Sequence, residues 1–174
     1  MPLDQTRSPS GDHRRVWALR PVLSAWALTI GLDLFFNAGV FMPLFDQERE
    51  PSLLPDEVLF RRIPVAYAAL LIGVAFLAYA IDRVEPRSIL IGAAQGGLLG
   101  VVLASMGIVS LWTAIDMTGT FVAAGSLVVV LEFAAAAAVL AAFRLSGRRD
   151  FARRVLLLAL LAAVGGIVVQ NLWA

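Results

Sequence analysis

Long apolar runs separated by short polar segments dominate the chain. Five of these runs have about 19 to 25 residues each, enough for an α-helix to cross a hydrocarbon core of roughly 30 Å. We predict membrane-spanning helices at residues 21–44, 63–81, 88–112, 121–143 and 155–173. The predicted fold is therefore an all-α integral membrane bundle of five transmembrane helices, a single membrane domain over residues 19–174.

The polar segments have different characters. Residues 1–18 are rich in serine, proline and charge, so we expect a disordered cytoplasmic tail. The first apolar run is longer than the roughly 7 to 15 apolar residues of a cleaved signal peptide, and we expect it to be retained. In the charged loop 46–62, Pro51 and Pro55 argue against one continuous helix, although Pro55 could open a short interfacial helix. Pro64 is tolerated in the first turn of the next span.

Composition supports a membrane protein and excludes several kinds of site. The chain is 60% hydrophobic and only 16% charged, whereas soluble domains are roughly 25% charged. It has no cysteine and its only histidine is His13, so no disulfide framework, iron–sulfur site or Cys/His zinc site can form. We expect no metal site and no cofactor. All fourteen basic residues are arginine, which together with the alanine and leucine content suggests a bacterial protein.

Arginine distribution predicts the orientation, since cytoplasmic loops of membrane proteins carry an excess of positive charge. With a cytoplasmic N-terminus, the inner segments hold eleven arginines and the outer segments three. We therefore predict a multi-pass protein of the bacterial inner membrane, with its N-terminus in the cytoplasm and its C-terminus outside. The arginines next to the last two spans are expected to contact anionic lipid head groups rather than nucleic acid: Arg144, Arg148, Arg149, Arg153 and Arg154.

Two acidic residues, Asp33 and Glu132, lie near the midpoints of the first and fourth spans, at nearly the same predicted depth. An acidic residue at a helix centre costs roughly 2.5 to 3.5 kcal/mol, so both should face the bundle interior. Thr29 and Asn37 extend a polar stripe around Asp33, and Tyr67 is deep enough to donate to a buried carboxylate. No basic residue lies within the apolar runs, so we expect the acids to be partly protonated, sharing a proton if they meet.

These residues, Asp33, Glu132, Thr29, Asn37 and Tyr67, form the predicted ionisable centre, and no catalytic residue is assigned. One hypothesis is a small transporter-like protein coupled to protons or cations, because buried carboxyl groups often bind and release such ions. The alternative is a non-catalytic accessory or structural subunit, in which the acids only lock helices together. A membrane enzyme acting on lipid or isoprenoid is disfavoured, since there is no catalytic His or Cys and no D-D-x-x-D motif.

The third span carries a row of small residues at intervals of four. Gly92, Gly96, Gly100 and Ala104 form overlapping G-x-x-x-G patterns, which let another helix backbone come close. This row predicts helix packing within the chain, with homo-oligomerisation as the alternative. It is not a phosphate-binding loop, because the Walker pattern needs a lysine and the chain has none.

Three segments also resemble small bacterial membrane protein families of about four helices, whose activity is not established. These are LDLFFNAGVFMPLF in the first span, GGLLG in the third and VLEFAAAA in the fourth. The resemblance covers residues 20–143 and implies an acid in the first helix and another in the last of the four. It departs from the family pattern at TAIDMTG, where an aromatic residue and Thr-Asn are expected, and at the fifth helix. The resemblance implies a fold with a polar interior, but no reaction.

Overall fold

The structure, a computed structural model, describes residues 19–47, 56–113, 118–146 and 149–173. Of these described residues 95% are helical and none lies in a strand. Five helical segments are long and apolar enough to cross a membrane, which confirms the predicted all-helical class and the number of spans. The tail expected at residues 1–18 lies outside the described residues.

The five spans are built from nine helical elements in the described part of the chain. In chain order these are α1 (Leu19–Asp33), the π-helix η1 (Leu34–Val40), α2 (Met42–Gln47), α3 (Asp56–Val84), α4 (Ile89–Ala104), the π-helix η2 (Ser105–Val109), α5 (Ser110–Trp112), α6 (Gly119–Ser146) and α7 (Arg149–Trp173). The first span is α1 with η1, and the third is α4 with η2 and α5.

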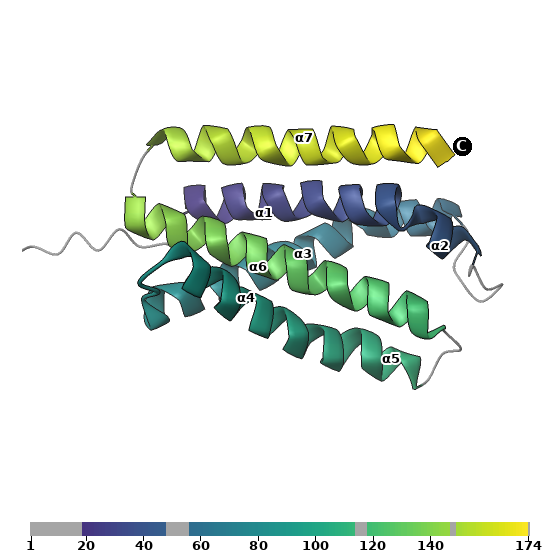
Figure 1. Ribbon diagram of the computed structural model, residues 1–174, viewed down its shortest axis with the longest axis horizontal. Coiled ribbons are helices and arrows are strands. Elements are labelled where there is room, and N and C mark those ends of the chain that lie inside the picture. The colour runs from purple at the N-terminus through teal and green to yellow at the C-terminus, as the bar shows by residue number, and fades with distance from the viewer. Residues whose placement is uncertain (1–18, 48–55, 114–117, 147–148, 174) are drawn as a thin grey trace, which may run out of the picture.

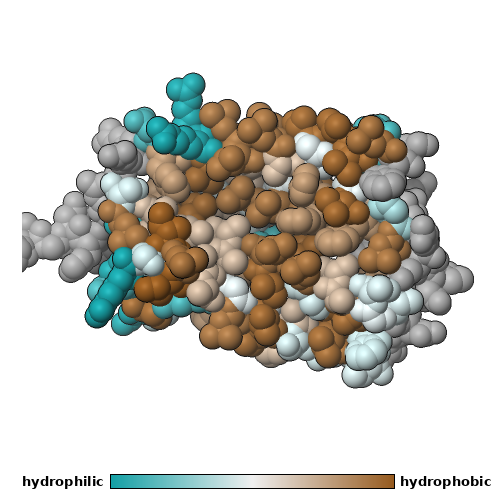
Figure 2. All heavy atoms as spheres, viewed as in Figure 1, coloured by the Kyte–Doolittle hydropathy of each residue, from teal (hydrophilic) through white to brown (hydrophobic). Residues whose placement is uncertain are grey.

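Successive spans run in opposite directions, so α1 begins at one end of the bundle and α7 ends at the other (Figure 1). Helix α6 lies between α1 and α4, while α7 lies parallel to α1 on the outside of the bundle (Figure 1). Figure 2 shows apolar side chains across the middle of one face and hydrophilic side chains towards the ends of the bundle. This distribution is that of a protein surrounded by lipid.

Small residues allow the closest helix contacts. Gly92, Gly96, Gly100 and Ala104 are all buried. The three glycines lie directly against α6: a Cβ added at Gly100 would stand 2.7 Å from Cα of Val130, and one at Gly96 would meet the Phe133 carbonyl oxygen. The glycine row therefore forms the contact between α4 and α6. Homo-oligomerisation stays a prediction.

The contact between the first and last spans follows the same principle. Gly31 lies against the backbone of Ala159, and a Cβ added at Gly39 would stand 3.0 Å from Cα of Gly166. The first span thus packs against α7 along much of its length, through positions without bulky side chains. This close fit fixes the helix that carries Asp33 to its neighbour.

Several predicted helix boundaries are wrong. The first span ends at Val40 rather than residue 44, with a bend at Phe41 before α2. Helix α3 starts at Asp56 rather than residue 63, so the short interfacial helix expected in the loop is its first part and Pro64 lies inside it. Helix α7 starts at Arg149 rather than residue 155. Hydropathy marks where a helix enters lipid, whereas its backbone hydrogen bonds continue into the polar segments.

Candidate functional site

Asp33 stands at the junction between α1 and η1, where the backbone changes from α-helix to π-helix. The side-chain amide of Asn37, within η1, donates a 2.6 Å hydrogen bond to Oδ1 of Asp33. Single π-helical turns inside longer helices occur frequently at functional sites. The backbone irregularity therefore coincides with the only acidic residue of this span.

Tyr67 brings a second donor from α3. Its hydroxyl donates a 2.9 Å hydrogen bond to Oδ2 of Asp33, so each carboxylate oxygen of Asp33 accepts a bond from a neutral donor. The backbone carbonyl of the same tyrosine accepts a 2.9 Å bond from the indole Nε1 of Trp26 on α1. Two bonds at one residue thus join α3 to the first span.

Glu132 enters the same region from α6. It is only 5% exposed, and its Oε1 has no hydrogen-bond partner among the described residues. Its carboxyl group lies close enough to Asp33 for two negative charges to repel each other. Since an uncompensated buried charge costs several kcal/mol, the two acids form an unequal pair, one with two donors and one with a bare oxygen.

The structure does not bring every predicted residue to the pair. Thr29 is fully buried, but its hydroxyl donates 2.7 Å to the carbonyl of Trp26 within the same helix and makes no bond to Asp33. Of the predicted centre, Asn37 and Tyr67 contact Asp33, and Glu132 lies near enough to interact with its charge. Thr29 instead satisfies itself locally, as threonine often does in helices.

Trp26 is the contact that sequence reasoning missed. Its signal in the sequence is its depth, since tryptophans of membrane proteins usually lie near the lipid–water boundary. Two other polar atoms of the bundle interior, Gln95 Oε1 and Ser126 Oγ, are also buried without a hydrogen-bond partner among the described residues. Buried polar atoms of this kind are uncommon.

The chemistry available at this site is proton or small-cation binding by carboxyl oxygens. Within the part of the chain that the structure describes, no group of three or more His, Cys, Asp or Glu side chains could hold a metal ion. The two carboxyl groups can exchange a proton or hold a monovalent cation.

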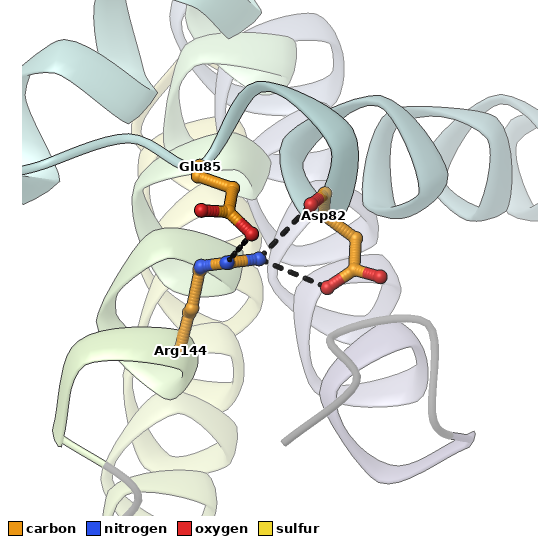
Figure 3. A network of polar contacts seen from close by, with 3 residues as sticks. All are labelled: Asp82, Glu85 and Arg144. Carbon is orange, nitrogen blue, oxygen red and sulfur yellow. Dashed lines mark hydrogen bonds and ion pairs between the residues drawn. The ribbon is translucent and has the colours of Figure 1, made fainter. Parts of the chain in front are cut away.

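A second polar cluster closes one end of the bundle (Figure 3). Arg144 of α6 contacts Asp82 Oδ1 at 2.9 Å through Nη1 and Glu85 Oε1 at 2.6 Å through Nη2. Nη1 also donates to the Asp82 carbonyl at 3.1 Å. We call this cluster the Arg144 clamp. It fixes the C-terminal end of α3 to α6, so Arg144 has protein partners in the place where lipid head groups were expected.

No protein-family model, curated protein or solved structure matches the chain. The resemblance to small bacterial membrane protein families therefore stays a prediction. Function must be argued from the arrangement of the site.

Proposed function

We propose that the protein is a small transporter-like membrane protein that couples movement of a solute or ion to the binding and release of a proton or monovalent cation. Asp33 and Glu132 are the binding groups, Asn37 and Tyr67 orient Asp33, and Thr29 lies one turn before Asp33 with its hydroxyl bonded within its own helix. The observation that carries this proposal is the unequal setting of the two acids: both oxygens of Asp33 accept hydrogen bonds, while Glu132 Oε1 is buried and bare.

The difference in hydrogen bonding between Asp33 and Glu132 suits a carboxyl group that must bind and release a proton or cation. Asp33 has the donors that stabilise a carboxylate, and Glu132 lacks them, so a proton held on Glu132 removes the repulsion between the pair. A pair that served only to lock helices would be expected to satisfy its buried oxygens, as most buried polar groups do. The bare oxygen of Glu132 is the position at which an arriving proton or cation would bind.

The proposal includes an orientation and a location. The N-terminal end of the bundle lies in the cytoplasm and the C-terminus outside, in a bacterial inner membrane, because the arginines favour that side. At the arginine-rich end, Arg154 lines a pocket of about 530 Å³ together with Ile89 and Phe151. Arg153 and Arg154 are exposed there and are the proposed contacts for anionic lipid head groups.

The test is a comparison of amide variants in proteoliposomes. Asp33→Asn and Glu132→Gln keep size and remove ionisation, so they should still fold and lose proton- or cation-driven flux. Asp150→Asn, an exposed acid in the first turn of α7, is the matched control and should keep flux. If wild-type protein carries no proton or cation flux and both variants fold as it does, transport is refuted in favour of an accessory subunit.

A further inference from the structure

Helix α3 is packed into the bundle along only one half. Its buried apolar residues all lie in the C-terminal half: Val74, Leu77, Ala78 and Ile81. From residue 61 to residue 69, every side chain except that of Tyr67 is exposed. Leu70 and Leu71 pack against the core, so the N-terminal part of α3, residues 61–69, has little apolar contact holding it to the other helices, whereas the part from Leu70 onward belongs to the core.

Polar contacts add to this asymmetry. The Arg144 clamp fastens the C-terminal end of α3 through three contacts to Asp82 and Glu85 (Figure 3). Within residues 61–69, the described hydrogen bonds to other helices are both at Tyr67: its hydroxyl to Asp33 and its carbonyl from Trp26. The C-terminal end of α3 is thus held by core packing and ion pairs, whereas residues 61–69 have Tyr67 as their described hydrogen-bonded contact to other helices.

Gly73 lies close to the boundary between these two parts and is the single glycine of α3. A Cβ added there would stand 3.2 Å from the ring of Phe133, so the helix passes close to α6 at this point. Glycine lacks the side chain that stiffens a helix, so α3 can bend at this position where its packing changes. Gly73 is therefore the natural pivot.

We propose that the N-terminal part of α3 is a gate over the Asp33–Glu132 site, with Tyr67 as its latch and Gly73 as its pivot. Closed, the latch holds α3 against α1 and covers Asp33. Open, it would expose both acids from the end of the bundle where α3 begins. The role in transport rests on the proposed function, whereas the gate itself is a property of the helix packing.

The latch bond also senses the charge of Asp33. A hydrogen bond to a carboxylate is roughly twice as strong as one to a neutral group, so the latch is strongest on the charged carboxylate. The groups that face Asp33 are Asn37 on η1, Tyr67 on α3 and Glu132 on α6. Helix α7, which packs against this span, has no ionisable residue after Arg154.

Paired spin labels measure the gate directly, and the absence of native cysteine makes the labelling specific. Cysteines at Val65 and Leu161, which are 69% and 66% exposed, report the distance from the gate to α7. A second pair, Val84 and Leu157, reports the clamped end of α3. Distances are measured by double electron–electron resonance in lipid nanodiscs, with Tyr67→Phe to break the latch.

In Tyr67→Phe, the Val65–Leu161 distance should lengthen by more than about 2 Å, beyond ordinary helix shifts at interfaces. The Val84–Leu157 distance should not change. Trp26→Phe, which removes the other bond at Tyr67, should lengthen the first distance in the same direction. Tyr79→Phe is the control, because Tyr79 is a half-exposed tyrosine of the same helix whose ring lies under Arg83.

An unchanged Val65–Leu161 distance in both Tyr67→Phe and Trp26→Phe would overturn the latch. An equal lengthening in Tyr79→Phe would overturn it as well, since α3 would then loosen without regard to the site. The proposed function fails by a different result: amide variants of the acids that leave flux unchanged. A gate that opens in Tyr67→Phe while flux is independent of the acids would refute the acids as the coupling groups and leave the gate standing.

Discussion

Asn37 Nδ2 lies 2.6 Å from Asp33 Oδ1, one turn further along the first span, at the point where the α-helix becomes a π-helix. The wider π turn and the hydrogen bond occur together, so the carboxylate is held by its own helix before α3 contributes anything. Tyr67 then supplies the second donor from another helix. Asp33 is therefore oriented by one hydrogen bond from its own span and one from α3.

Removing the hydrogen bond from Asn37 to Asp33 should lower the unfolding free energy measurably. Asn37→Ala leaves Asp33 Oδ1 without its donor, and hydrogen bonds to charged groups contribute about 1.5–3 kcal/mol. Asn171 gives a matched control, because it also donates to an oxygen four residues earlier but is exposed. We expect Asn37→Ala to lose about 1–3 kcal/mol of unfolding free energy and Asn171→Ala to lose less than about 0.5 kcal/mol. Unfolding in mixed detergent micelles measures both, and equal losses would contradict the assigned role.

The glycine row makes a second prediction. A Cβ at Gly96 would meet both the Phe133 carbonyl oxygen and Cβ of Ala137, so α4 must move away from α6. Gly96→Ala should lower the unfolding free energy by about 1–3 kcal/mol, the usual cost of overpacking. Gly107→Ala is the control, since an added Cβ there meets nothing within 4 Å. Thermal unfolding of both variants in detergent tests this, and a Gly96→Ala protein as stable as Gly107→Ala would show that the contact is loose.

The Arg144 clamp predicts a ranking of variants. Arg144→Gln removes two ion pairs from a site where the arginine side chain is 15% exposed, and should cost about 1–3 kcal/mol. Arg144→Lys should fall between wild type and Arg144→Gln, because one ammonium cannot reach Asp82 and Glu85 as the forked guanidinium does. Arg153→Gln, on the exposed face of α7, should change stability by less than about 0.5 kcal/mol.

The ranking of these variants by unfolding free energy tests the Arg144 clamp better than the size of any single loss. Chemical unfolding of the three variants in one detergent gives the ranking directly. If Arg153→Gln destabilised the protein as much as Arg144→Gln, the loss would reflect the positive charge at this end of the bundle and not the specific ion pairs of the Arg144 clamp.

The arginine asymmetry predicts which side each terminus occupies. A C-terminal alkaline phosphatase fusion should be active and a C-terminal green fluorescent protein fusion dark, because the C-terminus is proposed to lie outside. The reverse pattern would place the C-terminus in the cytoplasm and contradict the proposed orientation.

The number of spans was predictable because the sequence separates five apolar runs with short polar segments. The ends of the helices were less predictable than the number of spans. Helix α3 begins seven residues before the predicted start at residue 63, since a helix need not end where lipid does. The bend at Phe41 had one usable signal, Pro43 in the first turn of the following helix, because proline has no backbone N–H with which to continue the hydrogen bonds of the preceding helix.

The sequence indicated which residues belong to the candidate site better than it indicated the hydrogen bonds between them. Spacing placed Asn37 one turn from Asp33, and depth placed Glu132 level with it. The bond from Trp26 to the Tyr67 carbonyl depends on how α3 leans against α1, which no local pattern records. Nor does LFFNAGV carry a pattern that distinguishes a π-helix from an α-helix. Such features arise from packing between helices distant in sequence.

The central claim is that Glu132 carries the proton or cation. Its most direct test is flux through Glu132→Gln in proteoliposomes containing a pH-sensitive dye or a cation indicator. Flux should fall to the level of protein-free liposomes while wild-type protein and Asp150→Asn remain active. Wild-type flux through a correctly folded Glu132→Gln protein would contradict the account.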